Sequence, residues 1–174
     1  MKIAVIGYSG GGKSTLAGKL AEKHGVPVLY MDTVHWLPGW KERTREEKQV
    51  IVEKFLNEND AWVIDGNYKS DLYDRRMAEA DRIVFISLGR LACLLRVVRR
   101  YRMNKGKARA SMTEGCEERL PLDFLFWVIH AGRTKKRRRV YLNTVKQYSE
   151  KSVVIKNQKE LDTFYQAEGL AFKE

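Results

Sequence analysis

The sequence predicts an α/β protein built on a five-stranded parallel sheet, and two observations predict this class. Short apolar runs rich in β-branched residues alternate along the chain with longer amphipathic stretches, which is the pattern of repeated strand–helix–strand units. Glycine or aspartate stands at the end of each of the first three runs, and ligands bind beyond the carboxyl ends of parallel strands. We therefore expect three layers, with helices covering both faces of the sheet.

The individual elements follow from this alternation. Strands are expected at 2–6, 26–32, 61–66, 82–88 and 152–157. Helices are expected at 13–25, 44–59, 69–80, 90–103, 121–149 and 158–169. Gly25 and Pro27 punctuate the first crossover, and Pro121 suits the first turn of the long helix that it begins. The segment 104–120 has no clear period, so we expect a loop there.

Length and composition limit what the chain contains. Its 174 residues, 44% hydrophobic and 32% charged, are enough for a single domain with its own core. No apolar run approaches the ~20 residues of a membrane span, and the glycine-rich start is unlike a signal peptide. Two cysteines, Cys93 and Cys116, are too few for a disulfide framework or a four-thiolate zinc site. We expect a reduced, cytoplasmic protein with no membrane partner.

The excess positive charge is concentrated in one segment. Residues 90–139 hold 15 Lys or Arg and 4 Asp or Glu, a difference of +11 that equals the net charge of the whole chain. Such a block attracts nucleotide phosphates, nucleic acid or an anionic membrane surface, and it is also typical of a solvated helix face. Its densest run, 133–139, has no interleaved aromatic residues, so sequence-specific nucleic-acid binding is not expected.

The segment Gly7–Ser14 is predicted to hold the phosphates of a nucleoside triphosphate. It matches G-x-x-x-x-G-K-[ST] at every fixed position and lies between a strand and a helix, as that motif requires. Glycines allow positive φ, so successive backbone amides point at an anion beside a helix N-terminus. Lys13 adds a charge for the β- and γ-phosphates, and Ser14 is a ligand for Mg²⁺. The predicted cofactor-binding set is Gly7, Ser9, Gly10, Gly11, Gly12, Lys13, Ser14 and Thr15.

Two classes of protein with this motif lack support in the sequence. A GTPase carries an N-K-x-D guanine reader, but the segment NKGK at Asn104 lacks the aspartate. A motor-type ATPase usually ends a strand in Asp-Glu, whereas Gly66 follows Asp65 here. Small-molecule and nucleotide kinases remain, because phosphoryl transfer depends mostly on positioning and charge.

Several segments together resemble one family. GYSGGGKSTLA, YMDTVHWLPGW, WVIDGNY, ADRIVFISLGRLACLLRVVRR and EGCEERLPLDFLFW are similar to the adenylate-kinase-like P-loop proteins known as DNA topology modulation (FlaR-like) proteins. The broader likeness is to nucleoside monophosphate kinases and shikimate-kinase-like enzymes. It implies a P-loop NTPase sandwich with a five-stranded parallel sheet, an acceptor-binding helical region at about 33–60 and a mobile, basic lid at about 96–139.

The resemblance also implies roles for individual residues. Asp65 matches an aspartate that orients a magnesium-bound water, and Asp32 a strand-ending aspartate that holds either a magnesium water or an acceptor hydroxyl. Arg96 and Arg100 are four apart on one helix face and match arginines that clamp the triphosphate. The predicted catalytic residues are Lys13, Asp65, Arg96 and Arg100; the predicted metal ligands are Ser14, Asp32 and Asp65. Arg119 and Arg133 are weaker candidates for the far side of the lid.

The acceptor is not expected to be AMP. Where adenylate kinases have D-G-F-P-R, this chain has DGNYK, so Lys69 replaces the arginine that meets the acceptor phosphate. The predicted substrate-binding residues are Asp32, Trp36, Asn67 and Tyr68. Trp36, Pro38 and Trp40 form an aromatic wall that either stacks on a base or sugar or packs against the sheet. His35 is either a ligand contact or a structural residue.

Two functions remain open at the level of sequence. The first is an ATP- and Mg²⁺-dependent kinase that transfers the γ-phosphoryl group to a small acceptor, which is a nucleotide, a nucleoside or another metabolite. The second is a nucleotide-regulated DNA-binding protein that influences DNA topology, for which the motive is the basic segment. The sequence identifies neither the acceptor nor the oligomeric state.

Overall fold

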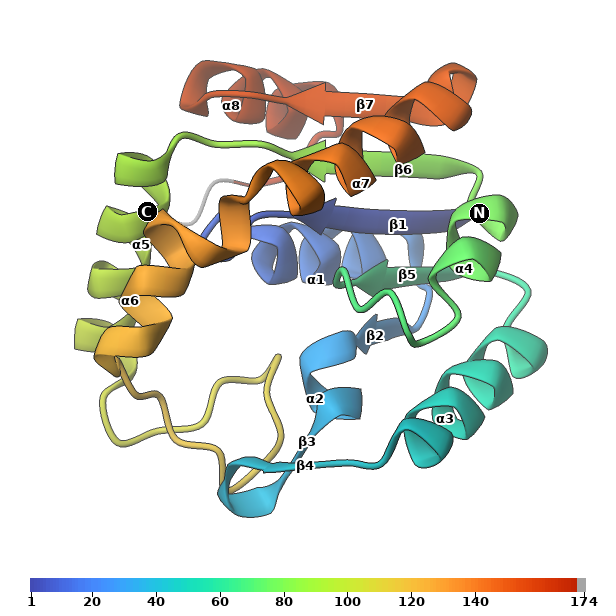
Figure 1. Cartoon of the computed structure of the whole chain (residues 1–174). Helices are drawn as coiled ribbons and strands as arrows, with labels where there is room; N and C mark the ends of the chain where they lie inside the picture. The colour runs from blue at the N-terminus through green and yellow to red at the C-terminus, as the bar shows by residue number, and fades with distance from the viewer. Residues whose placement is uncertain (172–174) are drawn as a thin grey trace.

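The computed structural model, which describes residues 1–171, confirms the α/β class (Figure 1). All five predicted strands are present and pair in parallel in the order β2-β5-β1-β6-β7. Their bounds are β1 Lys2–Gly7, β2 Val28–Tyr30, β5 Trp62–Asp65, β6 Arg82–Ile86 and β7 Ser152–Ile155. Ile3 to Ile6 of the central strand β1 are fully buried, as expected for a strand covered on both faces.

Helices cover both faces of this sheet (Figure 1). On one face lie α1 (Lys13–His24) and α8 (Gln158–Ala167), joined by an ion pair between Lys23 and Glu168. On the other face lie α4 (Tyr73–Glu79) and α7 (Lys135–Gln147). Beyond the carboxyl ends of the strands stand α5 (Arg90–Asn104) and α6 (Leu122–Ile129), which pack against each other.

The segment after β2 differs from the sequence prediction. The expected strand 26–32 ends at Tyr30, and Asp32 lies instead in a short helix, α2 (Met31–His35). A small antiparallel hairpin follows, formed by β3 (Trp36–Leu37) and β4 (Lys41–Glu42) around the turn η1 (Pro38–Trp40). Gly39 in this turn has φ 74°, a left-handed conformation that glycine adopts without strain. The helix α3 (Arg45–Glu58) begins at a Thr44 capping box, as the sequence pattern favours.

The predicted helix 121–149 is two helices. A short turn, η2 (Ala131–Arg133), separates α6 from α7, and the Thr134 side chain accepts a hydrogen bond from the Arg137 amide to begin α7. At Gly132 a Cβ atom would lie 2.8 Å from the Trp127 carbonyl oxygen, so the chain turns too tightly there for a larger residue. Pro121 stands just before α6 rather than within its first turn.

In the predicted loop 104–120 only Asn104, the last residue of α5, is helical; the rest contains no helix and no strand, and Lys105 and Glu118 form an isolated bridge. Both cysteines are buried free thiols. Within residues 1–171, no helix is long and apolar enough to cross a membrane.

Candidate active site

The phosphate-binding loop has the conformation that its sequence predicts. Gly7 ends β1, and Gly10 and Gly12 have φ 78° and 95° before α1 begins at Lys13. A Cβ atom at Gly7 would lie 2.2 Å from the Ile86 carbonyl oxygen, and one at Gly10 would lie 2.6 Å from the Cys93 carbonyl oxygen. The loop therefore depends on glycine both for its curvature and for its close approach to β6 and α5.

Lys13 and the helix α6 both contact this loop. The Lys13 Nζ atom donates to the Tyr8 carbonyl oxygen at 3.3 Å, which holds the ammonium group over the loop. The Trp127 indole donates to the Ser9 hydroxyl at 3.3 Å. An anion held by the loop amides would therefore lie beside the Lys13 ammonium group. The Trp127 contact places α6 against the loop at Ser9.

Ser14 and Asp65 form a polar pair next to the loop. Asp65 ends β5, and its Oδ2 atom accepts a hydrogen bond from the Ser14 hydroxyl at 2.5 Å. Asp65 is only 4% exposed, and its Oδ1 atom is buried without a hydrogen-bond partner among the described residues. Burial raises the pKa of Asp65 to about 6, although the charge of Lys13 opposes the rise.

This pair fits a magnesium ion shared with phosphates. Mg²⁺ prefers oxygen ligands and commonly takes only one or two from the protein, the rest being water and substrate phosphate. The Ser14 hydroxyl and the orphaned Asp65 oxygen supply such ligands beside the predicted phosphate cradle. In the part of the chain that the structure describes, no three His, Cys, Asp or Glu side chains gather to hold a metal alone.

Asp32 and Tyr68, two of the predicted substrate-binding residues, lie together near Asp65. The Tyr68 hydroxyl donates to Asp32 Oδ1 at 2.7 Å. The negative charge of Asp32 also contributes to the raised pKa of Asp65, so the two carboxylates are neighbours. Burial and the charge of Asp32 raise the pKa of Tyr68, which keeps its hydroxyl protonated as a donor. The two side chains are thus brought together as predicted, although Asp32 projects from a helix rather than from a strand end.

Asn67 pairs with the backbone at the start of the glycine loop. Its side-chain amide donates to the Gly7 carbonyl oxygen at 2.7 Å, and its Oδ1 atom accepts from the Gly7 amide at 2.9 Å. Both polar ends of this side chain are therefore occupied by the backbone at the start of the phosphate loop. Asn67 therefore links β1 to the turn after β5, and its role as a substrate ligand stays a prediction.

Arg76 also holds the turn after β5, and it was not among the residues predicted from the sequence. Its guanidinium group donates to the Gly66 carbonyl oxygen at 3.1 Å and to the Tyr68 carbonyl oxygen at 2.8 Å. The side chain is fully buried, and burial lowers its pKa to about 10. Its position on the same face of α4 as the buried Tyr73 and Met77 is the periodic signal that would have marked it.

A cluster of aromatic rings adjoins Tyr68. The ring of His35 lies 4.6 Å from that of Tyr68 and 4.6 Å from that of Trp36, and Trp36 lies 5.5 Å from Trp40. Lys48 lies 3.3 Å from His35 Nδ1. Burial and this lysine lower the pKa of His35, which favours its neutral form.

The two predicted clamp arginines reach different partners. Arg96 Nη1 donates to the Gly11 carbonyl oxygen at 2.8 Å, and Nη2 donates to Gln158 at the start of α8. Arg100 Nε donates to Glu118 at 2.8 Å, and Glu118 also accepts from Arg109 Nε at 2.6 Å. Arg109, which the sequence reading did not single out, lies near enough to lower the pKa of Asp65. Arg109 lies outside the helices and strands, so no periodic pattern in the sequence marked it.

The two weaker lid candidates have structural partners. Arg133 donates to the Val128 and Leu88 carbonyl oxygens and to Cys93 Sγ, and its guanidinium group lies 4.0 Å from the centre of the Tyr8 ring. Arg133 therefore connects the end of α6, α5 and Tyr8 of the glycine loop, and its lid role stays a prediction. Arg119 stacks over Trp40 at 4.4 Å, at the tip of the hairpin.

The loop 104–120 docks on the β3–β4 hairpin. Thr113 Oγ1 donates to the Trp36 carbonyl oxygen at 2.6 Å, and the Gly39 amide donates to the Gly115 carbonyl oxygen at 3.1 Å. The Cys116 thiol donates to the Leu37 carbonyl oxygen at 3.2 Å. The loop that carries Arg109 is thus joined to the hairpin that follows α2, the helix of Asp32.

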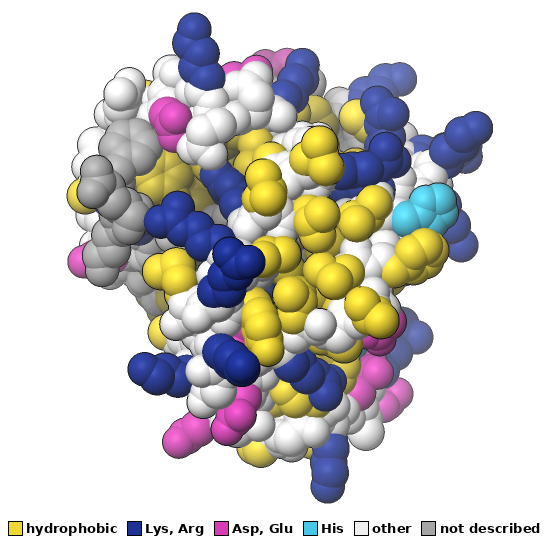
Figure 2. Space-filling model, turned by 90° about the vertical axis from the view of Figure 1, so that its left-hand side faces the viewer, with side chains coloured by type: hydrophobic (Ala, Val, Ile, Leu, Met, Phe, Trp, Pro, Cys, Tyr) yellow, Lys and Arg dark blue, Asp and Glu magenta, His cyan; other side chains and the backbone are white. Residues whose placement is uncertain are grey.

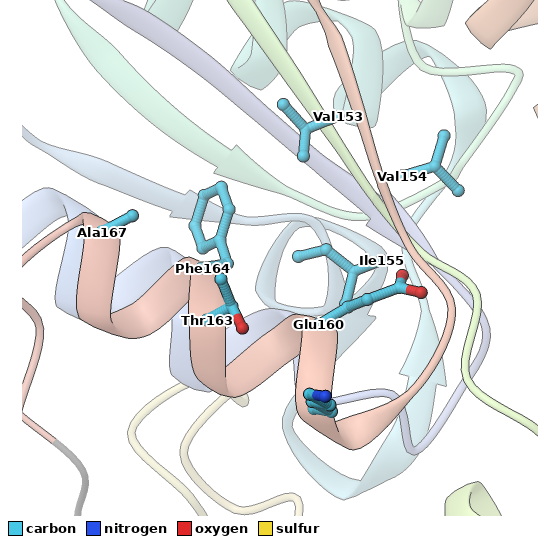
Figure 3. A pocket seen from close by; sticks show the side chains of 8 residues that line it. Val153, Val154, Ile155, Glu160, Thr163, Phe164 and Ala167 are labelled. Atoms are coloured by element: carbon cyan, nitrogen blue, oxygen red, sulfur yellow. The ribbon is translucent and has the colours of Figure 1, made fainter.

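A separate hollow lies between β7 and α8, away from these residues (Figure 3). It is lined mainly by apolar side chains, among them Val153, Phe164 and Ala167. It contains none of the groups that converge on the phosphate loop, so the chemistry of the candidate site is assigned from the loop and not from this hollow.

Solved structures share the fold of this chain. No protein-family model and no curated protein matches it. It is similar to deoxyadenosine kinase from M. mycoides with bound dATP, with a TM-score of 0.52, 13% identity and coverage of 96% of this chain and 98% of that chain. It is also similar to shikimate kinase from Bacteroides thetaiotaomicron, with a TM-score of 0.50, 18% identity and coverage of 98% and 99%. A protein from Thermus thermophilus has a TM-score of 0.52 at 14% identity over 96% and 95%. The fold is therefore the nucleoside-monophosphate-kinase-like P-loop fold.

Proposed function

We propose that the protein is an ATP- and Mg²⁺-dependent phosphotransferase that passes the γ-phosphoryl group to a small acceptor bound beside Asp32. The single observation that carries the proposal is the convergence of Lys13, the Ser14–Asp65 pair and Arg96 on one glycine loop. The fold similarity to two kinases, one of them with dATP bound, supports the same class of reaction. Membership of the FlaR-like family is part of this proposal, since it rests on the sequence resemblance alone.

The chain's own residues bind and orient the triphosphate. The loop amides and Lys13 hold the β- and γ-phosphates, while Arg96, anchored at Gly11, adds charge at the loop's rim. Ser14 and Asp65 would hold Mg²⁺, which when bound would supply positive charge to neutralise the phosphates. Arg100 lies near enough to interact with the charge of Asp32, and Arg109 with that of Asp65; from the lid, such donors stabilise the charge of a transferring phosphoryl group.

The acceptor carries a hydroxyl group that Asp32 positions. Asp32 Oδ1 is occupied by Tyr68, and among residues 1–171 no side chain or amide donates to Oδ2. This second oxygen accepts a hydrogen bond from the acceptor hydroxyl and directs its oxygen at the γ-phosphorus. As the new bond forms between that oxygen and phosphorus, the hydroxyl proton passes to Asp32 Oδ2, the bond from phosphorus to the bridging oxygen breaks, and ADP leaves with the electron pair. The rings of His35 and Trp36 flank the acceptor body.

A transfer assay with matched variants tests this function. Purified protein with Mg-ATP is offered a panel of nucleosides, nucleotides and hydroxylated metabolites, and phosphorylated products are identified by mass spectrometry. We expect one chemical class to be phosphorylated, and Lys13→Ala to reduce the rate by at least ~100-fold because the phosphate charge loses its cation. Lys19→Ala, on the same helix outside the loop, is the control. Failure of every acceptor in a broad panel would contradict the proposal.

The nucleic-acid alternative rests on one observation. Five consecutive cationic residues, Lys135–Arg139, are exposed on the first turns of α7. A gel-shift titration of duplex DNA over a range of salt concentrations separates the alternatives. Binding that persists at physiological salt would support a DNA-binding function, and binding confined to low salt marks a generic polyanion effect.

A further inference from the structure

Large apolar side chains gather on the outer side of α5 and α6. Figure 2 shows them as a continuous yellow area on the face that lies at the left of Figure 1. They are between 40% and 83% exposed, and we name them together the α5–α6 patch: Leu91, Leu95, Met103, Leu122, Phe126 and Ile129. The patch lies in the segment that also carries the whole charge excess of the chain.

The spacing of these side chains is that of a helix-packing seam. On α5 Leu91 and Leu95 are four residues apart, and on α6 Leu122, Phe126 and Ile129 follow at intervals of four and three. Each helix also has an inward side, where Cys93 and Val97 on α5 and Val128 on α6 are buried. A helix with apolar residues on an outer stripe as well as an inner one is typical of a helix with a second packing partner.

We propose that the α5–α6 patch is a two-fold interface between two copies of this chain. Its six side chains expose the equivalent of about four complete large apolar side chains. At roughly 150 Å² for each side chain of this size, the patch exposes about 600 Å², near the upper end of what monomers show. A stable interface needs about 800 Å² per partner, and the apolar stems of flanking arginines such as Arg99 extend the patch toward that value.

The arrangement of the two helices suits self-association. α5 and α6 lie side by side, and the loop 105–121 connects them at one end (Figure 1), so they run in opposite directions. A two-fold axis in the plane of the patch places this pair on the same pair of the second copy, which generates a four-helix bundle. The outer apolar stripe of each helix then packs against the same stripe of the second copy, as an isologous interface requires.

Charge favours the orientation in which the copies are turned end to end. Arg90 and the cations of α7 lie at the end where α6 finishes. The loop end carries both signs, with Glu117 and Asp123 beside Arg102, Lys105 and Arg119, and Figure 2 shows Asp and Glu side chains mixed with Lys and Arg side chains along the lower edge of the patch. An antiparallel two-fold therefore keeps the two cationic ends apart and sets each of them against a loop end that holds carboxylates. Charge sets the orientation and the apolar area supplies the affinity; like charges at the rim are screened within ~8 Å at physiological salt.

The test is the solution mass of matched variants. Light scattering after size exclusion, with the full chain over a wide concentration range, should give about twice the 20.2 kDa of one chain. The double variant Leu95→Lys/Phe126→Lys should give the mass of one chain, because two ammonium groups per copy would be buried at the seam. The control is Val50→Lys, at a similarly exposed apolar position on α3 outside the patch, which should remain a dimer.

Circular dichroism and a cooperative thermal transition establish that each variant is folded before its mass is interpreted. A wild-type protein that is monomeric at the highest concentration overturns the proposal, and so does a dimer that survives the double substitution. A monomer that co-sediments with phosphatidylcholine–phosphatidylserine vesicles assigns the patch to a lipid surface instead, and also overturns it. None of these outcomes depends on kinase activity, so the proposed interface is tested independently of the proposed function.

Discussion

At the scale of single residues, Asp65 belongs to the candidate site and lowers the free energy of unfolding. Its carboxyl group is buried, and one oxygen has no hydrogen-bond partner within residues 1–171. The native pKa of about 6 is above the ordinary value of 3.8, so the native state binds more protons than the unfolded state between these values. The free energy of unfolding therefore falls as the pH rises through this window and stays low above it.

Asp65→Asn should stabilise the protein at neutral pH. The amide keeps a hydrogen bond with Ser14 and removes the buried charge, so the free energy of unfolding should rise by on the order of 2–3 kcal/mol at pH 7. The difference from wild type should close as the pH falls toward about 4. Urea unfolding at several pH values measures it. A variant that is less stable than wild type at neutral pH would show that the buried carboxylate is compensated by its surroundings.

Arg76 is a residue whose loss should damage the site through the fold. Arg76→Met leaves the Gly66 and Tyr68 carbonyl oxygens without their donor, and we expect a loss of about 3 kcal/mol in the free energy of unfolding. The control is Arg75→Met, because the Arg75 side chain is 35% exposed in its ion pair and surface pairs contribute about 1 kcal/mol or less. Chemical denaturation of both variants compares them directly; equal losses would contradict the assignment.

Sequence reasoning found the residues whose chemistry is local. The Gly7–Ser14 loop was predicted because its conformation depends on residues next to one another, and Asp65 because it ends a buried run. The role of Asn67 as a substrate ligand stays a prediction, and its pairing with Gly7, sixty residues away, was not predicted because nothing local indicates it. Arg109 was missed for the same reason: its neighbour Glu118 is brought to it by the loop and by α5.

At the scale of elements, periodicity predicted what lies in the core and failed at the boundaries of exposed helices. The five strands were found because both faces of the sheet are covered, which gives continuous apolar runs. The helical period continues through the turn at Gly132, so α6 and α7 were predicted as one helix. The β3–β4 hairpin has only two residues in each strand, too few to show alternation.

Glu118 should determine how well the loop 104–120 is ordered. Its side chain is 4% exposed and neutralises Arg100 and Arg109 together. In Glu118→Gln the two guanidinium groups repel each other without compensation, so amide hydrogen exchange across this loop should accelerate by roughly tenfold or more, an opening cost about 1.4 kcal/mol lower. Glu117→Gln, at the exposed neighbouring position, should leave the exchange unchanged. If amide exchange in the loop is equally fast in both variants, the contacts with the hairpin alone keep the loop ordered.

At the scale of the whole molecule, the parallel sheet brings distant segments to one edge. The phosphate loop follows β1, Asp65 ends β5 and Asp32 follows β2, and these three strands are neighbours in the sheet order. That convergence was predictable from the strand ends. The docking of the loop 104–120 on the hairpin was not, because it joins backbone carbonyl groups to residues about eighty positions away, and a carbonyl group is present at every position.

Because the triphosphate would contact β1, α1, α5 and the lid at once, its binding should stabilise the whole fold. With Mg²⁺ and a non-hydrolysable ATP analogue at ~100 times its Kd, mass action adds about 2.7 kcal/mol to the free energy of unfolding. For a chain of this size, that raises Tm by about 5–10 °C. Lys13→Ala should abolish most of the shift, because its ammonium group lies over the loop, while its own ligand-free Tm stays near that of wild type. Thermal denaturation with and without the analogue measures both. An equal shift in the two proteins would place the nucleotide elsewhere, since a ligand bound at the loop cannot be indifferent to the loss of that charge.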